Sequence, residues 1–139
     1  MKNLILGLLL QSIGLSAFAG TVSEQSMDSS LLNRLVRFNL YTPDDYQSSE
    51  SQRFPVLYLL HGASGNETSW LRSGNIESTL DNLIESGAIP PMLVVMPADP
   101  NVWWADSHLE SAQSSLINEL IPHVDQHFRT LSKREGRLI

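Results

Sequence analysis

The loop that comes closest to a reactive centre in this sequence is His61-Gly62-Ala63-Ser64-Gly65-Asn66, which follows an apolar run. Its Gly62-Ala63-Ser64 begins like the G-x-S-x-G turn that presents a nucleophilic serine. That turn needs a glycine where Asn66 stands, so we do not expect Ser64 to be a nucleophile. A His-Gly loop after an early strand instead predicts a backbone N–H that binds an oxyanion. Ala63 is the candidate donor, with Gly62 beside it in the substrate site. The alternative is a tight glycine turn without a catalytic role.

Three tryptophans lie on loops near the predicted strand ends, at Trp70, Trp103 and Trp104. Their rings could line a ligand pocket and stack on an aromatic group or a sugar. The alternative is core packing or loop anchoring. The sequence favours this alternative for Trp70 and leaves both readings open for Trp103 and Trp104.

Other polar residues have simpler explanations. We expect His61 to hydrogen-bond its own loop rather than act as a base or a ligand. Asp99, Asp106 and His108 could form an oxygen–nitrogen metal site, but Asp106 and His108 also suit a helix start. No metal and no cofactor is therefore expected.

Two further pairs of polar residues are expected on the surface. His123 and His127 lie in a polar segment and are predicted to be solvated, and Asp81 and Glu85 are predicted to form a surface pair.

The elements that must position these residues alternate between strands and helices. Val36, Phe38 and Leu40 alternate with polar residues, which predicts a half-buried strand over 35–41. The unbroken apolar runs 56–60 and 92–96 are typical of strands covered on both faces. This order predicts an α/β fold, in which ligands bind at the carboxyl ends of the parallel strands.

Helical periodicity separates these runs. Apolar residues spaced as on one helix face predict a helix over 76–84, and Gly87 fits the position after its end. A second apolar stripe starts at Leu109, where Ser107 and Glu110 form a capping box. Pro122 is expected to kink or break this helix.

Residues 1–19 are typical of a signal peptide. Lys2 precedes an apolar run over 4–10, and Ala17-Phe18-Ala19 matches an A-x-A cleavage pattern before Gly20. A membrane anchor needs about 20 nearly unbroken apolar residues, and polar residues interrupt this stretch. We therefore expect export to the periplasm or the medium, with cleavage near Ala19 and no stable membrane span afterwards.

The remaining chain divides in two. Residues 20–34 are polar and serine-rich, which predicts a flexible arm, and residues 35–139 are predicted to form the folded domain.

The composition excludes several classes of protein. The 139 residues are 42% hydrophobic and 17% charged, which excludes disordered, collagen-like and coiled-coil chains. The net charge is −6 and the nine Lys and Arg residues form no cluster, so nucleic acid is not an expected partner. The absence of cysteine excludes disulfides and thiolate metal sites. Nothing in the sequence indicates an oligomeric state.

Three blocks of sequence are together specific. They are FPVLYLLHG at 54–62 followed by Ser69-Trp70, GAIPPM and VVMP within 87–97, and LIPHVD, FRT and REGR within 120–137. Together they resemble the esterase family of α/β-hydrolases, which includes S-formylglutathione hydrolase (esterase D), feruloyl esterases and the antigen 85 acyltransferases. The resemblance runs from about residue 35 to residue 139, and it favours Ala63 as the oxyanion donor.

This resemblance implies the N-terminal half of an α/β-hydrolase fold, a mostly parallel sheet flanked by helices. The half is incomplete at the nucleophile strand, which would begin at Arg137-Leu138-Ile139. In the family the serine, the acid and the histidine all follow this point, so no residue here matches the catalytic triad. One hypothesis is a fragment of an exported serine esterase that acts on acyl-carbohydrate or aromatic-acid esters through an acyl-enzyme, with acyl transfer also open. The alternative is a non-catalytic module that binds carbohydrate or lipid through the tryptophan loops.

Overall fold

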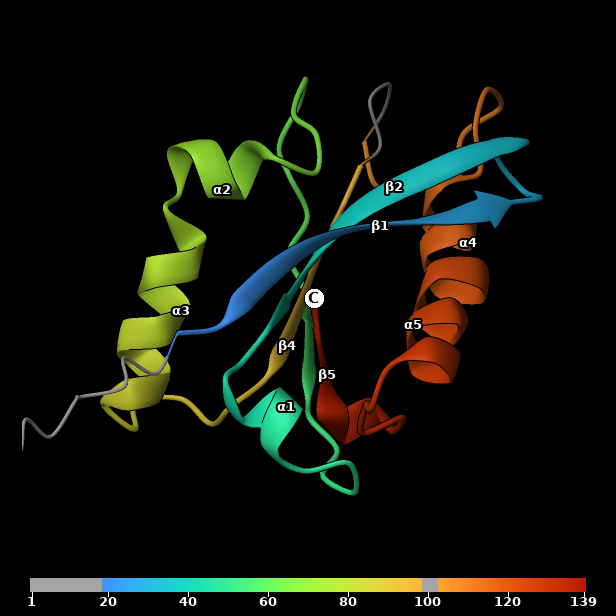
Figure 1. The fold of residues 1–139 in the computed structure, drawn as a ribbon. Coiled ribbons are helices and arrows are strands. Elements are labelled where there is room, and N and C mark those ends of the chain that lie inside the picture. The colour runs from blue at the N-terminus through green and yellow to red at the C-terminus, as the bar shows by residue number, and fades with distance from the viewer. Residues whose placement is uncertain (1–18, 99–102) are drawn as a thin grey trace, which may run out of the picture.

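The computed structural model describes residues 19–98 and 103–139, which form a five-stranded sheet with helices on both faces (Figure 1). The strands are β1 (Thr21–Ser29), β2 (Arg34–Thr42), β3 (Val56–Tyr58), β4 (Leu93–Pro97) and β5 (Arg137–Leu138). The helices are α1 (Asp45–Ser48), α2 (Ser69–Ser73), α3 (Ile76–Glu85), α4 (Ala112–Ser115) and α5 (Ile121–His127), with a π-helical turn at Leu116–Leu120 and a 3-10 turn at Arg134–Gly136.

The predicted α/β architecture is confirmed, but the sheet is mixed rather than mostly parallel. Its strand order is β1-β2-β4-β3-β5. β4, β3 and β5 run parallel, whereas β2 is antiparallel to both β1 and β4. A short turn joins β1 to β2, and so short a connection allows only an antiparallel pair. The parallel part of the sheet therefore starts at β4, and β5 forms its outer edge.

β4 is buried on both faces, as its unbroken apolar run predicts. Val94 belongs to a cluster with Leu80 of α3, whereas Val95 belongs to a cluster with Leu116 and Val124 of the opposite helical layer. Figure 1 shows α2 and α3 on one side of the sheet and α4 and α5 on the other. The central strands are thereby fixed from both sides, and the loops at their ends start from a rigid base.

The expectation of a flexible arm over 20–34 is wrong, because most of this segment is β1. β1 pairs with β2 along its whole length, from Thr21 opposite Thr42 to Ser29 opposite Arg34. It lies at the edge of the sheet, and only Met27 and Ser29 in it are fully buried. An edge strand has one neighbour and needs few apolar residues, so a serine-rich composition does not prevent it.

α3 ends as the sequence predicts. Gly87 has φ +71°, its N–H donates to the Ile84 carbonyl, and the Ala88 N–H donates to the Leu83 carbonyl. These two bonds form a Schellman motif, whose left-handed residue is usually glycine. The motif turns the chain back toward β4.

The break that the sequence allowed at Pro122 does not occur, because helical turns continue without interruption from α4 to α5. The π-helical turn directly before this proline provides the room, since the Ile121 N–H donates to the Leu116 carbonyl five residues back. Such a wider turn is a known way to accommodate an irregularity in a helix. None of the helices within residues 19–98 and 103–139 has the length and apolar character that a membrane crossing requires.

The predicted capping box closes a local turn and not the helix. The Ser107 hydroxyl accepts the N–H groups of Leu109 and Glu110, both at 3.2 Å, but α4 begins only at Ala112. The Asp106 carboxylate caps this helix instead, since it accepts the Ser114 N–H at 2.8 Å. Sequence spacing alone could not find this cap, because Asp106 lies outside the usual capping position.

Candidate oxyanion site

The loop after β3 forms a tight turn around Ala63. The Gly65 N–H donates to the Gly62 carbonyl at 3.0 Å, and Ser64 has φ +62°. A positive φ at the third residue is the geometry of a type II turn. Ser64 therefore lies in a turn five residues before the start of α2 at Ser69, not in the strand-to-helix elbow of a nucleophilic serine. The sequence-based rejection of Ser64 agrees with this geometry.

Ala63 is exposed at the tip of this turn. Within the described part of the chain, no acceptor lies within hydrogen-bond distance of its backbone N–H. A free N–H beyond the carboxyl end of a parallel strand can donate a hydrogen bond to a ligand oxygen, because no internal bond must first be broken. Gly62, the residue directly before Ala63, is also exposed.

The His61 side chain forms a hydrogen bond within its own loop, as the sequence predicts. Its ring is buried, and its Nδ1 lies 2.8 Å from the Gly62 carbonyl oxygen. A side chain on Gly65 would come within 2.9 Å of the imidazole, so only glycine allows this close approach. The His61 side chain therefore stabilises the turn.

Two tryptophans form hydrogen bonds with the segment that directly follows β3. The Trp70 indole N–H donates to the Leu60 carbonyl and the Trp104 indole N–H donates to the His61 carbonyl, each at 3.0 Å. The rings of Trp104 and His61 also meet edge to face, with centroids 5.2 Å apart. This geometry supports the anchoring alternative for Trp70 and Trp104. Trp103, by contrast, is 80% exposed.

Asn39 is a third anchor, and it lies on the face of the strand opposite Val36, Phe38 and Leu40. It is 2% exposed, and its side-chain amide donates to the Glu67 carbonyl at 2.9 Å. Arg37 of the same strand lies 3.5 Å from the Glu67 carboxylate. The signal in the sequence was a single amide side chain between apolar residues of a strand. A buried amide needs a hydrogen-bond partner, so such a residue indicates a contact with another segment.

A cleft of about 520 Å³ opens beside the turn. Its walls are the turn from Ser64 to Glu67, the residue after β4, Ala98, and the start of β2 with Arg34 and Arg37. The cleft lies at the carboxyl ends of the parallel strands, where the fold class predicts a ligand.

The metal candidates do not form a cluster in the described residues. The Asp106 carboxylate accepts both the hydroxyl and the N–H of Ser114, and these bonds lower its pKa. His108 is exposed, and no group of three potential ligands occurs in residues 19–98 and 103–139. Asp99, the third candidate, lies outside the described residues.

Two surface predictions need correction. His123 is partly buried, with its ring 6.1 Å from Phe38 and 4.1 Å from the exposed His127 ring. Burial, and then the charge of His127, lower the pKa of His123.

Asp81 does not pair with Glu85 at the surface. Its carboxylate accepts bonds from Tyr41 and from the backbone of Gly20 instead.

Known proteins share this sequence and fold. The family model described as "Putative esterase" matches residues 29–139. An endo-1,4-beta-xylanase/feruloyl esterase of Xylanibacter ruminicola is 32% identical over 85% of this chain, and an esterase of Mycobacterium tuberculosis is 28% identical over 73%. The chain spans only 17% and 22% of these two relatives.

Solved structures of esterases share the fold of this chain. A ferulic acid esterase aligns with a TM-score of 0.81 and 25% identity over 86% of this chain. A ferulic acid esterase of Anaeromyces mucronatus, solved with ferulic acid, aligns at 0.70 with 22% identity over 91% of this chain. In each case the chain covers 49% of the solved protein. Since the family model matches most of the sequence, this chain belongs to the "Putative esterase" family and has part of its α/β-hydrolase fold.

Proposed function

We propose that this chain is the N-terminal part of an exported serine esterase and supplies one donor of its oxyanion hole, the Ala63 N–H. The nucleophile, the acid and the histidine come from residues outside this sequence. In the reaction, the serine attacks the ester carbonyl, and the Ala63 N–H stabilises the negative oxygen of the tetrahedral intermediate. The acyl-enzyme that forms is then hydrolysed by water.

The exposed N–H of Ala63, in a turn that other side chains hold in place, is the observation that carries this proposal. An oxyanion donor acts best when it is oriented before the reaction, since no reorganisation is then needed. Trp70, Trp104 and Asn39 anchor the chain on both sides of the turn. These bonds leave the Ala63 N–H free while they fix its direction.

We expect the substrates to be esters of aromatic acids or acylated carbohydrates. Relatives named for feruloyl esterase activity support this class. The cleft beside the turn could hold one part of such an ester, with the exposed Trp103 ring available to stack on a sugar or an aromatic group. Export fits a substrate outside the cell, and the A-x-A pattern at Ala17–Ala19 supports export.

The alternative of a non-catalytic binding module is less well supported. Such a module needs a platform of several exposed aromatic rings. Of the three tryptophans, all within the described residues, only Trp103 is exposed, because Trp70 and Trp104 bond to the backbone within the fold.

The test uses the full-length gene product with methyl ferulate, a feruloylated arabinose ester and an acetyl ester. We expect hydrolysis with a burst of acyl-enzyme, and fluorophosphonate labelling of one serine outside residues 1–139. Ser64→Ala should retain both turnover and label. Labelling of Ser64 itself, or serine-dependent turnover by the 139-residue chain alone, would show that the nucleophile has been assigned wrongly.

A further inference from the structure

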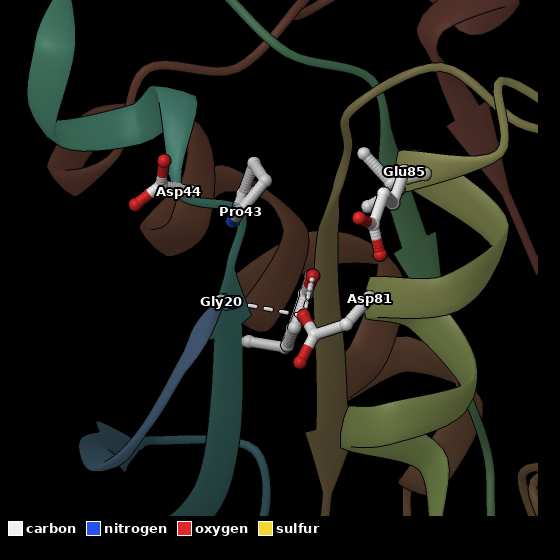
Figure 2. A pocket seen from close by; sticks show the side chains of 7 residues that line it. Gly20, Pro43, Asp44, Asp81 and Glu85 are labelled. Atoms are coloured by element: carbon white, nitrogen blue, oxygen red, sulfur yellow. Dashed lines mark hydrogen bonds between the residues drawn. The ribbon is translucent and has the colours of Figure 1, made fainter. Parts of the chain in front are cut away.

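A second pocket lies between the start of β1, the end of β2 and α3, whereas the cleft beside the Ala63 turn lies at the start of β2. It has a volume of about 250 Å³, and its lining includes Gly20, Tyr41, Asp44, Asp81 and Glu85. Figure 2 shows Asp81 directed from α3 toward Gly20. The pocket is separate from the turn around Ala63, and the proposed esterase reaction does not use it.

Gly20 is held at this pocket by its backbone. Its N–H donates to Asp81 Oδ1 at 2.8 Å, and the Tyr41 hydroxyl donates to the same oxygen at 2.8 Å. Tyr41 is 1% exposed, and burial, together with its bond to Asp81, raises its pKa. The tyrosine therefore keeps its proton and remains a donor to the carboxylate at neutral pH.

Only glycine fits at position 20. A Cβ atom there would lie 2.3 Å from Cε2 of the Tyr41 ring, which is itself buried and cannot move away easily. The next residue, Thr21, already pairs with Thr42 in the sheet. The Gly20 nitrogen is thus fixed in front of Asp81 by sterics as well as by hydrogen bonding.

The charge of the pocket suits a cation at this nitrogen. Three of its lining residues are the carboxylates Asp44, Asp81 and Glu85, and none is lysine or arginine. A peptide N–H offers one donor and no net charge, whereas an α-ammonium group offers three donors and a positive charge. A carboxylate forms a stronger bond with a charged donor than with a neutral one.

We infer that this pocket binds the α-ammonium group of Gly20 once the segment ending at Ala19 has been removed. This inference rests on the export part of the proposed function. Hydrolysis of the Ala19–Gly20 peptide bond consumes one water and leaves a carboxylate on Ala19 and an ammonium on Gly20. The new ammonium then pairs with Asp81 and attaches the start of β1 to α3.

The titratable groups around this position come from each neighbouring element. They are Tyr41 at the end of β2, Asp44 after it, and Glu77, Asp81 and Glu85 of α3. Four of these groups are carboxylic acids and none is a base, so the surroundings favour the charged form of the amine. The free amine of an N-terminal residue ordinarily has a pKa of about 7.7–8.0, and in this pocket it should be higher.

The experiment measures how fast the N-terminal amine of the exported, processed full-length protein reacts with an acetylating N-hydroxysuccinimide ester at pH 7. Intact mass identifies the first residue, and peptide mass spectrometry follows the label on Gly20. Because a one-unit fall in amine pKa raises the neutral fraction about tenfold, we expect Asp81→Asn to react about tenfold faster than the wild type. Gly20→Ala should react as fast as Asp81→Asn, whereas Asp28→Asn, which removes an exposed carboxylate at the other end of β1, is the control and should stay within about twofold of the wild type on the same basis.

A wild-type chain that begins at Gly20 and reacts as fast as Asp81→Asn would overturn the inference alone. A processed chain that begins elsewhere would overturn it together with the proposed cleavage site. If the variants do not fold, the pH profile of wild-type labelling still decides. An apparent amine pKa above the ordinary value of about 8.0 supports the ion pair, and one at or below about 8.0 contradicts it. Ester hydrolysis measured in the same sample reports separately on the catalytic proposal.

Discussion

Three non-glycine residues in the described part of the chain have a positive φ, and Asn75 precedes α3. The other two, Asn33 and Ser64, lie in turns that follow a strand, and these turns differ in what their backbone N–H groups contact. In the turn between β1 and β2, where Asn33 has φ +49°, the N–H groups of Ser30 and Leu31 donate to the Glu119 carboxylate at 2.9 and 3.0 Å. In the turn after β3, where Ser64 has φ +62°, the Ala63 N–H has no acceptor within the described residues. The first turn is satisfied internally, and the second is open to a ligand.

This difference separates a structural turn from a candidate functional one. Backbone N–H groups inside a fold are nearly always paired. Within the described residues the Ala63 N–H is unpaired and lies in an anchored, exposed turn, so it can donate to an external acceptor. The comparison predicts that changes at the first turn lower stability, and that changes at the second mainly lower activity.

The largest expected effect follows removal of the Ala63 N–H itself. Proline has no backbone N–H, and it is well tolerated at the second position of a type II turn, so Ala63→Pro should keep the fold. Loss of one oxyanion donor costs about 10²–10³ in kcat, and we expect that loss for the full-length enzyme, with KM little changed. Ala63→Ser keeps the N–H and is the matched control. Equal kcat values for the two variants would show that Ala63 is not a donor.

The next effect is expected at the first turn. Glu119 accepts the two backbone N–H groups and also the hydroxyls of Ser29 and Ser115. Glu119→Gln replaces one of its acceptor oxygens by an NH₂ group. Since the carboxylate is only partly buried, we expect a loss of about 1–2 kcal/mol in the free energy of unfolding at pH 7, measured by urea denaturation, with kcat unchanged.

The same variant predicts a pH dependence. Partial burial opposes the charge of Glu119, but the hydrogen bonds it accepts outweigh this and lower its pKa. Because the folded-state pKa is below the unfolded value of about 4.3, the stabilisation is complete above that pH and is lost as the pH falls through the folded-state pKa. The stability gap between wild type and Glu119→Gln should therefore close on acidification. Glu24→Gln, on the exposed side of β1, should show no gap at any pH.

A smaller effect is expected from the anchors of the second turn. Trp104→Phe keeps an aromatic ring but removes the N–H that bonds the His61 carbonyl. The lost hydrogen bond should cost about 1 kcal/mol of stability. It should also lower kcat severalfold, because Ala63 is then held less firmly. Trp103→Phe is the control for stability, since the Trp103 ring is exposed. A loss of stability as large for Trp103→Phe would remove the distinction between these neighbouring residues.

The sequence was sufficient for the parts of the fold that depend on local pattern. The doubly buried β4 follows from an unbroken apolar run, and the end of α3 follows from Gly87. β1 could not be predicted in this way. Its residues are mostly polar, and its place in the sheet depends on pairing with β2 and on the burial of Met27 and Ser29.

The candidate site shows the same division. Ala63 stays a prediction, made from its place after a buried strand and from the family resemblance. The contacts that fix its turn could not, because they join residues far apart in the sequence. Trp104 and His61 are separated by 43 positions, and Asn39 and Glu67 by 28. Periodicity assigns such side chains to a face of a strand or to a loop, but it does not identify their partners.

The smallest expected effect compares the left-handed residues of these two turns, Asn33 and Ser64, directly. An L-residue in this conformation is strained by roughly 1–2 kcal/mol, and glycine removes the strain, but glycine also gives the unfolded chain about 0.4–1 kcal/mol more conformational freedom. Asparagine tolerates the left-handed region better than serine does. Ser64→Gly should therefore raise the free energy of unfolding by at most about 1 kcal/mol, and Asn33→Gly should raise it less or lower it. Urea midpoints of the two variants in the full-length protein measure the difference. If Ser64→Gly is the less stable of the two, the Ser64 side chain contributes to the turn in a way that the structure does not explain.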